Sequence, residues 1–332
     1  MNEIDILKIP VSAIDMVDTG FRITGPNKNI ENLVNSVLEN GLLVPPLVLA
    51  NNNSYTIVSG FKRVEAVRQL GWETISCRVL STQEQNESAV LQKAARMAVS
   101  ESAFTRELQP GELIRAVALL EQYIDHKQIA DSSISLFNCD LNSGYLKTLS
   151  RLHKMPKQAM DLIDTGHLSI KATKTLLAMD KKSVNSFLDL FSNIKVSSGK
   201  QIEIINWANE ICARDGIDLP KLLDDTLKAL GISQTDQASL SAHKDLAARG
   251  NQLRTHLLQR RYPALEAARK KAVEHLNRLK LGPGIKVSLP VNFESTVYSI
   301  QIDFKSVDEF KSRMEKLVSL QNNPDLKGLL DR

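Results

Sequence analysis

The chain has 332 residues, of which 42% are hydrophobic and 24% are charged. This is an ordinary globular composition, and the length exceeds one small core, so we expect two or three domains. The low aromatic content of 5% favours a helix-rich architecture over a large sandwich or barrel. No apolar run approaches 18 residues, and the first residues lack the basic and then apolar pattern of a signal peptide, which predicts a cytoplasmic protein without a membrane partner.

The net charge and the cysteine content do not by themselves decide whether the protein binds nucleic acid or a metal ion. The formal net charge of +4 is too small to indicate a nucleic-acid partner. Residues 241–281, however, hold ten Lys and Arg against three Asp and Glu. This surplus fits either a solvated helix face or a surface that meets DNA or a partner. The three cysteines, Cys77, Cys139 and Cys212, are widely spaced, which predicts reduced, buried thiols rather than a metal site.

The first 80 residues read as a small α+β domain. Apolar residues of Asn32–Leu38 fall on one helical face, and Gly41 stands where that helix should end. Residues 47–49 and 55–58 predict two strands joined by a turn at residues 51–53. A second helix should run from Gly60 to Leu70, and residues 75–80 predict a further strand.

From Gln85 onward the pattern is helical for nearly two hundred residues, with breaks expected at Pro110, Pro156 and Gly166. Two polar stretches, residues 197–200 and 231–242, predict linkers or surface loops. A long basic helix should cover residues 246–281, which Pro263 either kinks or divides in two. Residues 285–289 and 297–304 then predict two strands, and residues 307–320 a last amphipathic helix.

The segment from Leu136 to Pro156 predicts a helix-turn-helix. Residues 134–139 would form its first helix, and Asn142 or Ser143 would cap the second. In that second helix the apolar residues at 145/146, 149, 152 and 155 are spaced to face a core, while the opposite face is polar and basic. Periodicity alone favours an ordinary amphipathic helix over a helix that lies against DNA.

The spelling of this helix resembles the ParB family of partition proteins. The family motif has a Tyr, an Arg-Leu pair six residues later, and a Lys, an apolar residue and a Pro shortly after that pair. This chain has the same spacing at Tyr145, Arg151, Leu152 and residues 154–156. The family's following segment is matched by Gly166, Leu168, Ser169, Ala172, Leu176 and Leu177. Residues 32–49, 55–71 and 101–110 are similar to its N-terminal motifs, and residues 286–310 to its strand-strand-helix dimerisation domain.

The resemblance implies a fold of the α+β class. We expect a small α+β domain of the nucleotide-binding type over residues 1–95 and an all-helical, helix-turn-helix DNA-binding domain over 96–195. A helical linker region should cover residues 196–282. The C-terminal dimerisation domain, over 283–332, should contain a helix and a strand-strand-helix unit. Its implied partners are a second copy of the chain, double-stranded DNA with an inverted-repeat site, and a ParA-type ATPase.

The resemblance also implies a site for CTP and Mg²⁺ in the N-terminal domain. A triphosphate is bound well by a helix N-terminus with basic residues nearby, and the matching positions are Gly60, Lys62, Arg63, Glu101, Ser102 and Arg106. Glu101 and Ser102 would hold the metal. The chain departs from the family pattern at Phe61, Glu65, Ser102 and Thr105, which puts nucleotide hydrolysis in doubt, and no catalytic residue is predicted.

The residues expected to contact DNA all belong to the second helix of the helix-turn-helix. Those near Asn142–Lys147 would enter the major groove, and Arg151 and Lys154 would contact phosphates. The full set is Asn142, Ser143, Tyr145, Lys147, Thr148, Arg151 and Lys154.

Three functions remain open: a partition protein acting as a CTP-dependent DNA clamp, a ParB-type transcriptional regulator, and an enzyme. The enzyme would be a CTPase switch, including one whose hydrolysis is lost, or, ranked last, a nuclease.

Overall fold

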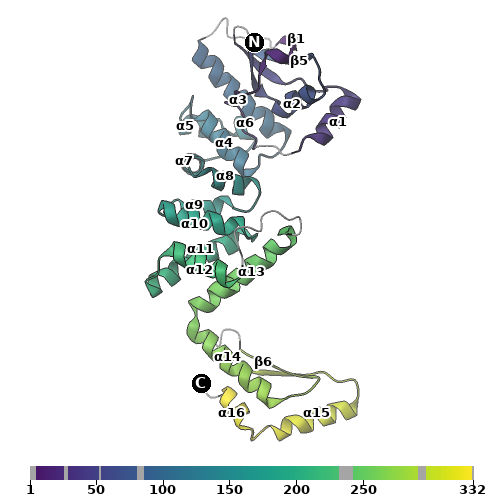
Figure 1. The fold of residues 1–332 in the computed structure, drawn as a ribbon, viewed down its shortest axis with the longest axis vertical. Helices are drawn as coiled ribbons and strands as arrows, with labels where there is room; N and C mark the ends of the chain where they lie inside the picture. Colours follow the sequence, from purple (N-terminus) through teal and green to yellow (C-terminus); the bar gives the residue numbers. More distant parts are fainter. Residues whose placement is uncertain are drawn as a thin grey trace. The chain divides into compact units, whose positions relative to one another are not determined.

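The computed structural model describes residues 5–25, 29–51, 54–80, 86–231, 242–290 and 297–330 (Figure 1). The chain divides into two compact units, residues 1–205 and 206–332. The first unit combines a five-stranded sheet with helices, and the second contains helices with a two-stranded sheet. The predicted α+β class is therefore confirmed.

The N-terminal sheet is mixed, with strand order β1-β5-β3-β4-β2. Strand β1 is antiparallel to β5 and β3 is antiparallel to β4, whereas β3 with β5 and β2 with β4 are parallel. A short 3₁₀ helix at Val11–Ala13 joins the first two strands. The strands are β1 (Asp5–Pro10), β2 (Ile14–Asp15), β3 (Leu47–Asn51), β4 (Ser54–Ser59) and β5 (Thr74–Leu80).

Two helices complete this domain, α1 (Glu31–Asn40) and α2 (Phe61–Gln69). The buried core joins α2, through Val64 and Val67, to the sheet, through Val48, Ile57 and other residues. The predicted helices and the strands β3, β4 and β5 are confirmed. Strands β1 and β2 were not predicted, because most side chains of β1 are exposed and β2 has only two residues. The turn predicted at residues 51–53 lies partly outside the described residues.

Helices fill the rest of the first unit, and they end where the sequence predicted breaks. Pro110 begins α4, Pro156 caps α8, and Gly166 follows the end of α8 with a φ of 71°. The helices are α3 (Glu87–Thr105), α4 (Pro110–Leu120), α5 (His126–Asp131), α6 (Ser133–Phe137), α7 (Ser143–His153), α8 (Lys157–Asp164), α9 (Ile170–Leu176) and α10 (Lys181–Ser192).

The prediction of a loop at residues 197–200 was wrong, because helix α11 (Ser198–Asp215) begins there. The side chain of Gln201 is buried, and its amide donates to the carbonyls of His167 and Val196 and accepts from the Ser169 backbone. Ser198 also donates to the Ser169 hydroxyl at 2.9 Å. Tertiary hydrogen bonds therefore support a polar segment that has no apolar periodicity. In the second polar stretch, residues 232–241 lie outside the described residues.

In the second unit, Pro263 divides the predicted basic helix into two, α13 and α14, which settles the choice between a kink and a new helix. Trp207 of α11 lies beneath Arg254 and Arg261 of α13, whose guanidinium carbons are 5.2 and 5.7 Å from the ring centroid. The remaining elements are α12 (Leu219–Ala229), α13 (Ala242–Arg261), α14 (Pro263–Leu279), β6 (Ile285–Ser288), β7 (Ser299–Ile302), α15 (Val307–Ser319) and α16 (Pro324–Leu330).

The three cysteines are free thiols, as predicted, but only Cys77 is buried. Cys139 is exposed and Cys212 is half-buried, so the expectation of buried thiols was wrong for these two. Cys139 lies in the connection between α6 and α7, where no core covers it. Burial raises the pKa of the Cys77 thiol to about 11, which keeps it protonated at neutral pH.

Candidate functional site

Strand β4 leads directly into Gly60, which begins helix α2 with a φ of 95°. A side chain at this position would place its Cβ 2.8 Å from the Cβ of Pro46, so both the backbone conformation and the space require glycine. The first turn of a helix has backbone N–H groups without intrahelical partners and carries a partial positive charge. This helix start is therefore a favourable position for an anionic group.

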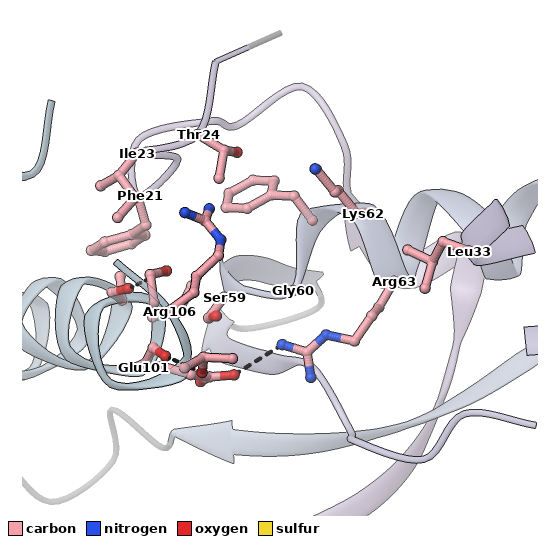
Figure 2. Close-up of a pocket in the computed structure, with 15 residues that line it drawn as sticks. Phe21, Ile23, Thr24, Leu33, Ser59, Gly60, Lys62, Arg63, Glu101 and Arg106 are labelled. Carbon is pink, nitrogen blue, oxygen red and sulfur yellow. Dashed lines mark hydrogen bonds and ion pairs between the residues drawn. The ribbon is translucent and has the colours of Figure 1, made fainter. Parts of the chain in front are cut away.

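A pocket of about 330 Å³ lies at this helix start (Figure 2). One wall comes from the loop that precedes α1, through Phe21, Ile23 and Thr24. A second wall comes from α3, through Glu101 and Ser102. All six residues predicted to bind nucleotide line this one pocket, which brings together Gly60, Lys62, Arg63, Glu101, Ser102 and Arg106.

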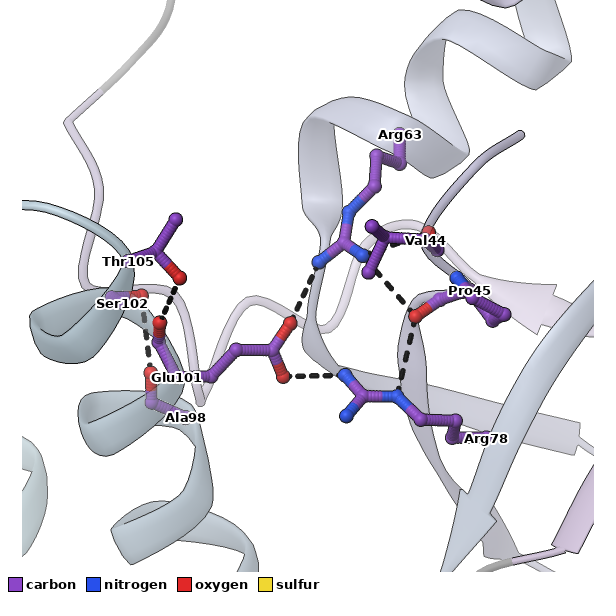
Figure 3. A network of polar contacts seen from close by, with 8 residues as sticks. All are labelled: Val44, Pro45, Arg63, Arg78, Ala98, Glu101, Ser102 and Thr105. Atoms are coloured by element: carbon purple, nitrogen blue, oxygen red, sulfur yellow. Dashed lines mark hydrogen bonds and ion pairs between the residues drawn. The ribbon is translucent and has the colours of Figure 1, made fainter. Parts of the chain in front are cut away.

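Glu101 is held by two arginines (Figure 3). Its Oε1 lies 2.9 Å from Nη2 of Arg63, and its Oε2 lies 2.6 Å from Nη2 of Arg78. Both guanidinium groups also donate to the carbonyl of Pro45, and Arg63 donates to that of Val44. Burial acts to raise the pKa of Glu101, but the hydrogen bonds and charges of the two arginines outweigh it and lower that pKa. Glu101 is thus an anion at neutral pH that links α3 to α2 and β5.

The neighbouring polar side chains of α3 already have partners. The hydroxyl of Ser102 donates to the carbonyl of Ala98 at 3.1 Å, and that of Thr105 donates to the carbonyl of Glu101 at 2.5 Å. Arg106 follows the helix in extended conformation, and its two Nη atoms bind the two carboxylate oxygens of Glu112 at 2.7 and 2.6 Å. Hydroxyl oxygens can still accept hydrogen bonds or ligate Mg²⁺. The metal-binding role of Glu101 and Ser102 stays a prediction.

Arg22 is a cation beside the pocket that sequence reasoning missed, and it contacts the pocket residue Phe61. Its guanidinium carbon lies 5.6 Å from the ring centroid of Phe61, a pocket residue. Its Nε is buried and finds no hydrogen-bond partner among the described residues. A buried donor without a partner is unfavourable unless a ligand satisfies it. The sequence gives one weak signal for Arg22, which is that it stands between the apolar residues Phe21 and Ile23. The segment has no periodicity that would assign it to a helix or a strand.

Among the described residues, the charged groups that line the pocket and their direct partners carry a surplus of three positive charges. Five cations, Arg22, Lys62, Arg63, Arg78 and Arg106, stand against the two carboxylates of Glu101 and Glu112. Arg106 is neutralised by Glu112, whereas the two arginines at Glu101 share one carboxylate. The pocket is therefore suited to an anion with several negative charges.

Helix α7 begins as predicted. The side chain of Asn142 accepts a hydrogen bond from the Tyr145 backbone N–H at 2.8 Å, which makes Asn142 the N-cap. Leu146, Leu149 and Leu152 are fully buried against the rest of the unit. Helix α7 packs on α4 and α5. This apolar face fixes which side of the helix meets solvent.

The exposed side of α7 carries Lys147, Arg151 and Lys154 at a spacing of four and three residues, so these cations share one face. No ion pair within the described part of the chain involves them. Ser143 and Tyr145 are half-buried, and Thr148 donates to the carbonyl of Gly144. The surface is basic and lacks carboxylate partners, as a helix that lies against phosphates requires.

The described residues contain no group of three or more His, Cys, Asp and Glu side chains that could hold a metal ion. None of their helices is both long and apolar enough to cross a bilayer.

Comparison with known proteins identifies the N-terminal domain. Residues 1–95 match the family model of the ParB N-terminal domain. The "Probable chromosome-partitioning protein ParB" of Campylobacter jejuni is 26% identical over 169 residues, 49% of this chain and 57% of that protein. The "Stage 0 sporulation protein J" of Bacillus subtilis is 26% identical over 191 residues, 55% of this chain and 62% of that protein. The chain thus spans about three fifths of the length of these relatives.

Solved structures also match at low similarity. The C-terminally truncated ParB of Caulobacter crescentus complexed with CTP-gamma-S has 19% identity and a TM-score of 0.25, and the match covers 56% of this chain and 98% of that one. The same protein complexed to the centromeric parS site has 15% identity and a TM-score of 0.33, with 59% and 96% covered. The match of residues 1–95 to the ParB N-terminal domain model and the two curated relatives thus show that this chain is similar to ParB-family proteins.

Proposed function

We propose that this chain is a partition protein that binds DNA through helix α7 and whose N-terminal pocket binds CTP with Mg²⁺. The observation that carries the proposal is that six residues chosen from sequence motifs, separated by up to 46 positions, line one pocket with a surplus of positive charge. The charges favour a polyphosphate. The choice of cytidine rests on the family resemblance, and partition is favoured over promoter binding by the names of the curated relatives.

The C-terminal elements supply the proposed dimer interface. Strand β7, helix α15 and the connection between them expose apolar side chains with exposed fractions of 38 to 68%, namely Ile300, Phe304, Val307, Phe310, Met314 and Val318. The α15 members recur at intervals of three or four residues and form one apolar face. A contiguous exposed apolar face is typical of an interaction site. A second copy of the chain would cover it and would pair two α7 helices for an inverted repeat.

The site on DNA and the biological role are tested together by chromatin immunoprecipitation with sequencing. Partition predicts a few inverted-repeat sites with protein spreading into flanking DNA, whereas transcriptional regulation predicts narrow peaks at promoters. Binding scattered without any enriched site contradicts both. A ParA-type ATPase partner stays a prediction, which stimulation of that ATPase by the purified protein would test.

Arg151→Ala should weaken binding to specific and random duplexes alike, because a phosphate contact carries no sequence information. The salt dependence of the DNA affinity should flatten by about one phosphate contact. Fluorescence anisotropy at several salt concentrations measures both effects. Arg68→Ala, which removes an exposed arginine of α2, is the control and should bind like the parent. Unchanged affinity of Arg151→Ala for both duplexes would remove α7 from the interface.

Arg22→Ala should lower CTP affinity at least about tenfold, because it removes a buried donor beside the pocket residue Phe61, and a charge-assisted hydrogen bond is worth about 1.5–3 kcal/mol. Isothermal titration calorimetry with CTP and MgCl₂ measures it. Lys8→Ala, an exposed cation of β1 outside the pocket, is the control. If Arg22→Ala binds CTP as tightly as the parent, the buried guanidinium serves the Phe61 contact alone.

A further inference from the structure

A second pocket of the first unit lies beside helix α7 and has no role in the proposed function. It has a volume of about 440 Å³ and lies where α7 passes into α8, at the end of α9 and along the first turns of α10. Its lining residues are 154–156, 176, 177, 179, 181, 184 and 185, and we call it the α7–α10 groove. It shares no lining residue with the pocket at the start of α2, and among its residues only Lys154 is also expected to contact DNA.

The floor of the α7–α10 groove is apolar. Leu176 of α9 and Val184 of α10 are buried in it, and Met155, Leu177 and Met179 are half-buried around it. Methionine side chains are unbranched and adapt to partners of different shape, so they are frequent at surfaces that bind peptides. Apolar side chains around a hollow offer a seat for the apolar side chains of another chain.

The rim of the groove is positively charged. Lys154 and Lys181 are exposed lining residues, and neither forms an ion pair with any residue that the structure describes. No Asp or Glu lines the groove. The carboxylate next in the sequence, Asp180, already accepts hydrogen bonds from the backbone N–H groups of Lys182 and Ser183 and from the Ser183 hydroxyl. The rim therefore carries positive charge that no neighbouring carboxylate neutralises, which favours an anionic partner.

The polar side chains of the lining all lie at this rim. Lys154, Lys181 and Asn185 are exposed, whereas the buried lining residues are Leu and Val. A site for a small molecule needs polar groups that converge inside the pocket to fix the ligand, and the floor of this groove offers none. Duplex DNA presents charged phosphates at its surface and would leave the apolar floor unfilled. The groove therefore fits a peptide in which apolar side chains stand next to carboxylates.

We propose that the α7–α10 groove binds a short acidic segment of a partner protein. Apolar side chains of that segment enter the groove, and its carboxylates pair with Lys154 and Lys181. Lys181 and Asn185 are four residues apart on α10, so they share one helix face and both border the bound segment. Lys182 does not line the groove, although it is the next residue of the same helix. The interaction requires neither nucleotide nor DNA.

The test uses the full chain and a phage-displayed library of random peptides of about twelve residues. Selection on the parent should enrich peptides that combine apolar with acidic residues. The most enriched sequence is then synthesised with a fluorescein label, and its affinity is measured by fluorescence anisotropy. Lys181→Glu reverses a charge of the rim, and Asn185→Trp fills the groove from an exposed position. Each should lower the affinity at least about tenfold, while thermal unfolding shows that both variants are folded.

Lys182→Glu is the matched control, because it makes the same charge change at an exposed position outside the groove. It should bind the peptide within about threefold of the parent. Selection that enriches no peptide, or only basic or uncharged ones, overturns the inference. So does an acidic peptide that binds Lys181→Glu and Asn185→Trp as tightly as the parent, because its site then lies elsewhere. If no peptide is selected and Asn185→Trp loses affinity for duplex DNA, the groove belongs to the DNA-binding surface instead.

Discussion

Arg63→Ala is expected to abolish measurable CTP binding, with an affinity loss of about 30-fold or more. Arg63 lies in the first turn of α2 and lines the pocket, and its side chain is 20% exposed. Truncating one partner of a partly buried charge pair costs about 2–5 kcal/mol, which corresponds to about 30-fold or more in affinity. Calorimetric titration with CTP and MgCl₂ measures the loss.

The same substitution also leaves Glu101 with Arg78 as its remaining arginine. We therefore expect a lower melting temperature as well, and thermal unfolding must show that the variant is folded at the temperature of the titration. Arg68→Ala is the matched control, because Arg68 lies on the same helix, is exposed and does not line the pocket. If folded Arg63→Ala binds CTP like the parent, the phosphates bind elsewhere.

The double substitution Val307→Asp/Val318→Asp is expected to convert the proposed dimer into monomers, with a rise in the dimer dissociation constant of about 1000-fold or more. The two valines lie on the apolar face of α15 and are 68 and 57% exposed, so the folded monomer loses little by their replacement. In a dimer each would bury an unpaired carboxylate, which costs several kcal/mol. Analytical ultracentrifugation across a concentration series measures the dissociation constant.

A control at the opposite side of the same helix separates charge from position. Ser312→Asp/Lys316→Asp adds two carboxylates at exposed positions that helical geometry places away from the apolar face. This variant should remain as associated as the parent. Equal association of both double variants would show that another surface joins the copies, and a monomeric parent would remove the dimer from the proposal.

Local patterns determined most of the elements. Helices stop or start at Gly41, Gly71, Pro110, Pro156 and Gly166, because glycine can adopt a positive φ and proline has a fixed φ and no N–H donor. These local properties act without any tertiary partner. Apolar spacing in residues 145–152 predicted the buried face of α7 for the same reason, since a helix repeats every 3.6 residues whatever it packs against. The motif spelling then indicated the family.

Contacts between distant segments decided the rest. Strand β1 exposes most of its side chains and exists because β5 offers it a free edge, and α11 begins at Ser198 because Gln201 is buried against His167. No local pattern records such contacts, since they depend on which segments meet after folding.

The candidate site likewise has features that the sequence predicted and features that depend on contacts between distant segments. The sequence by itself determined which residue types could hold a phosphate, because Gly60, Lys62 and Arg63 are adjacent at one helix start. Only the tertiary structure decided that Glu101 is held by Arg63 and Arg78, and that Arg22 lies over Phe61. The reason is that the charge state and reach of a side chain depend on neighbours that are close in space and remote in the chain.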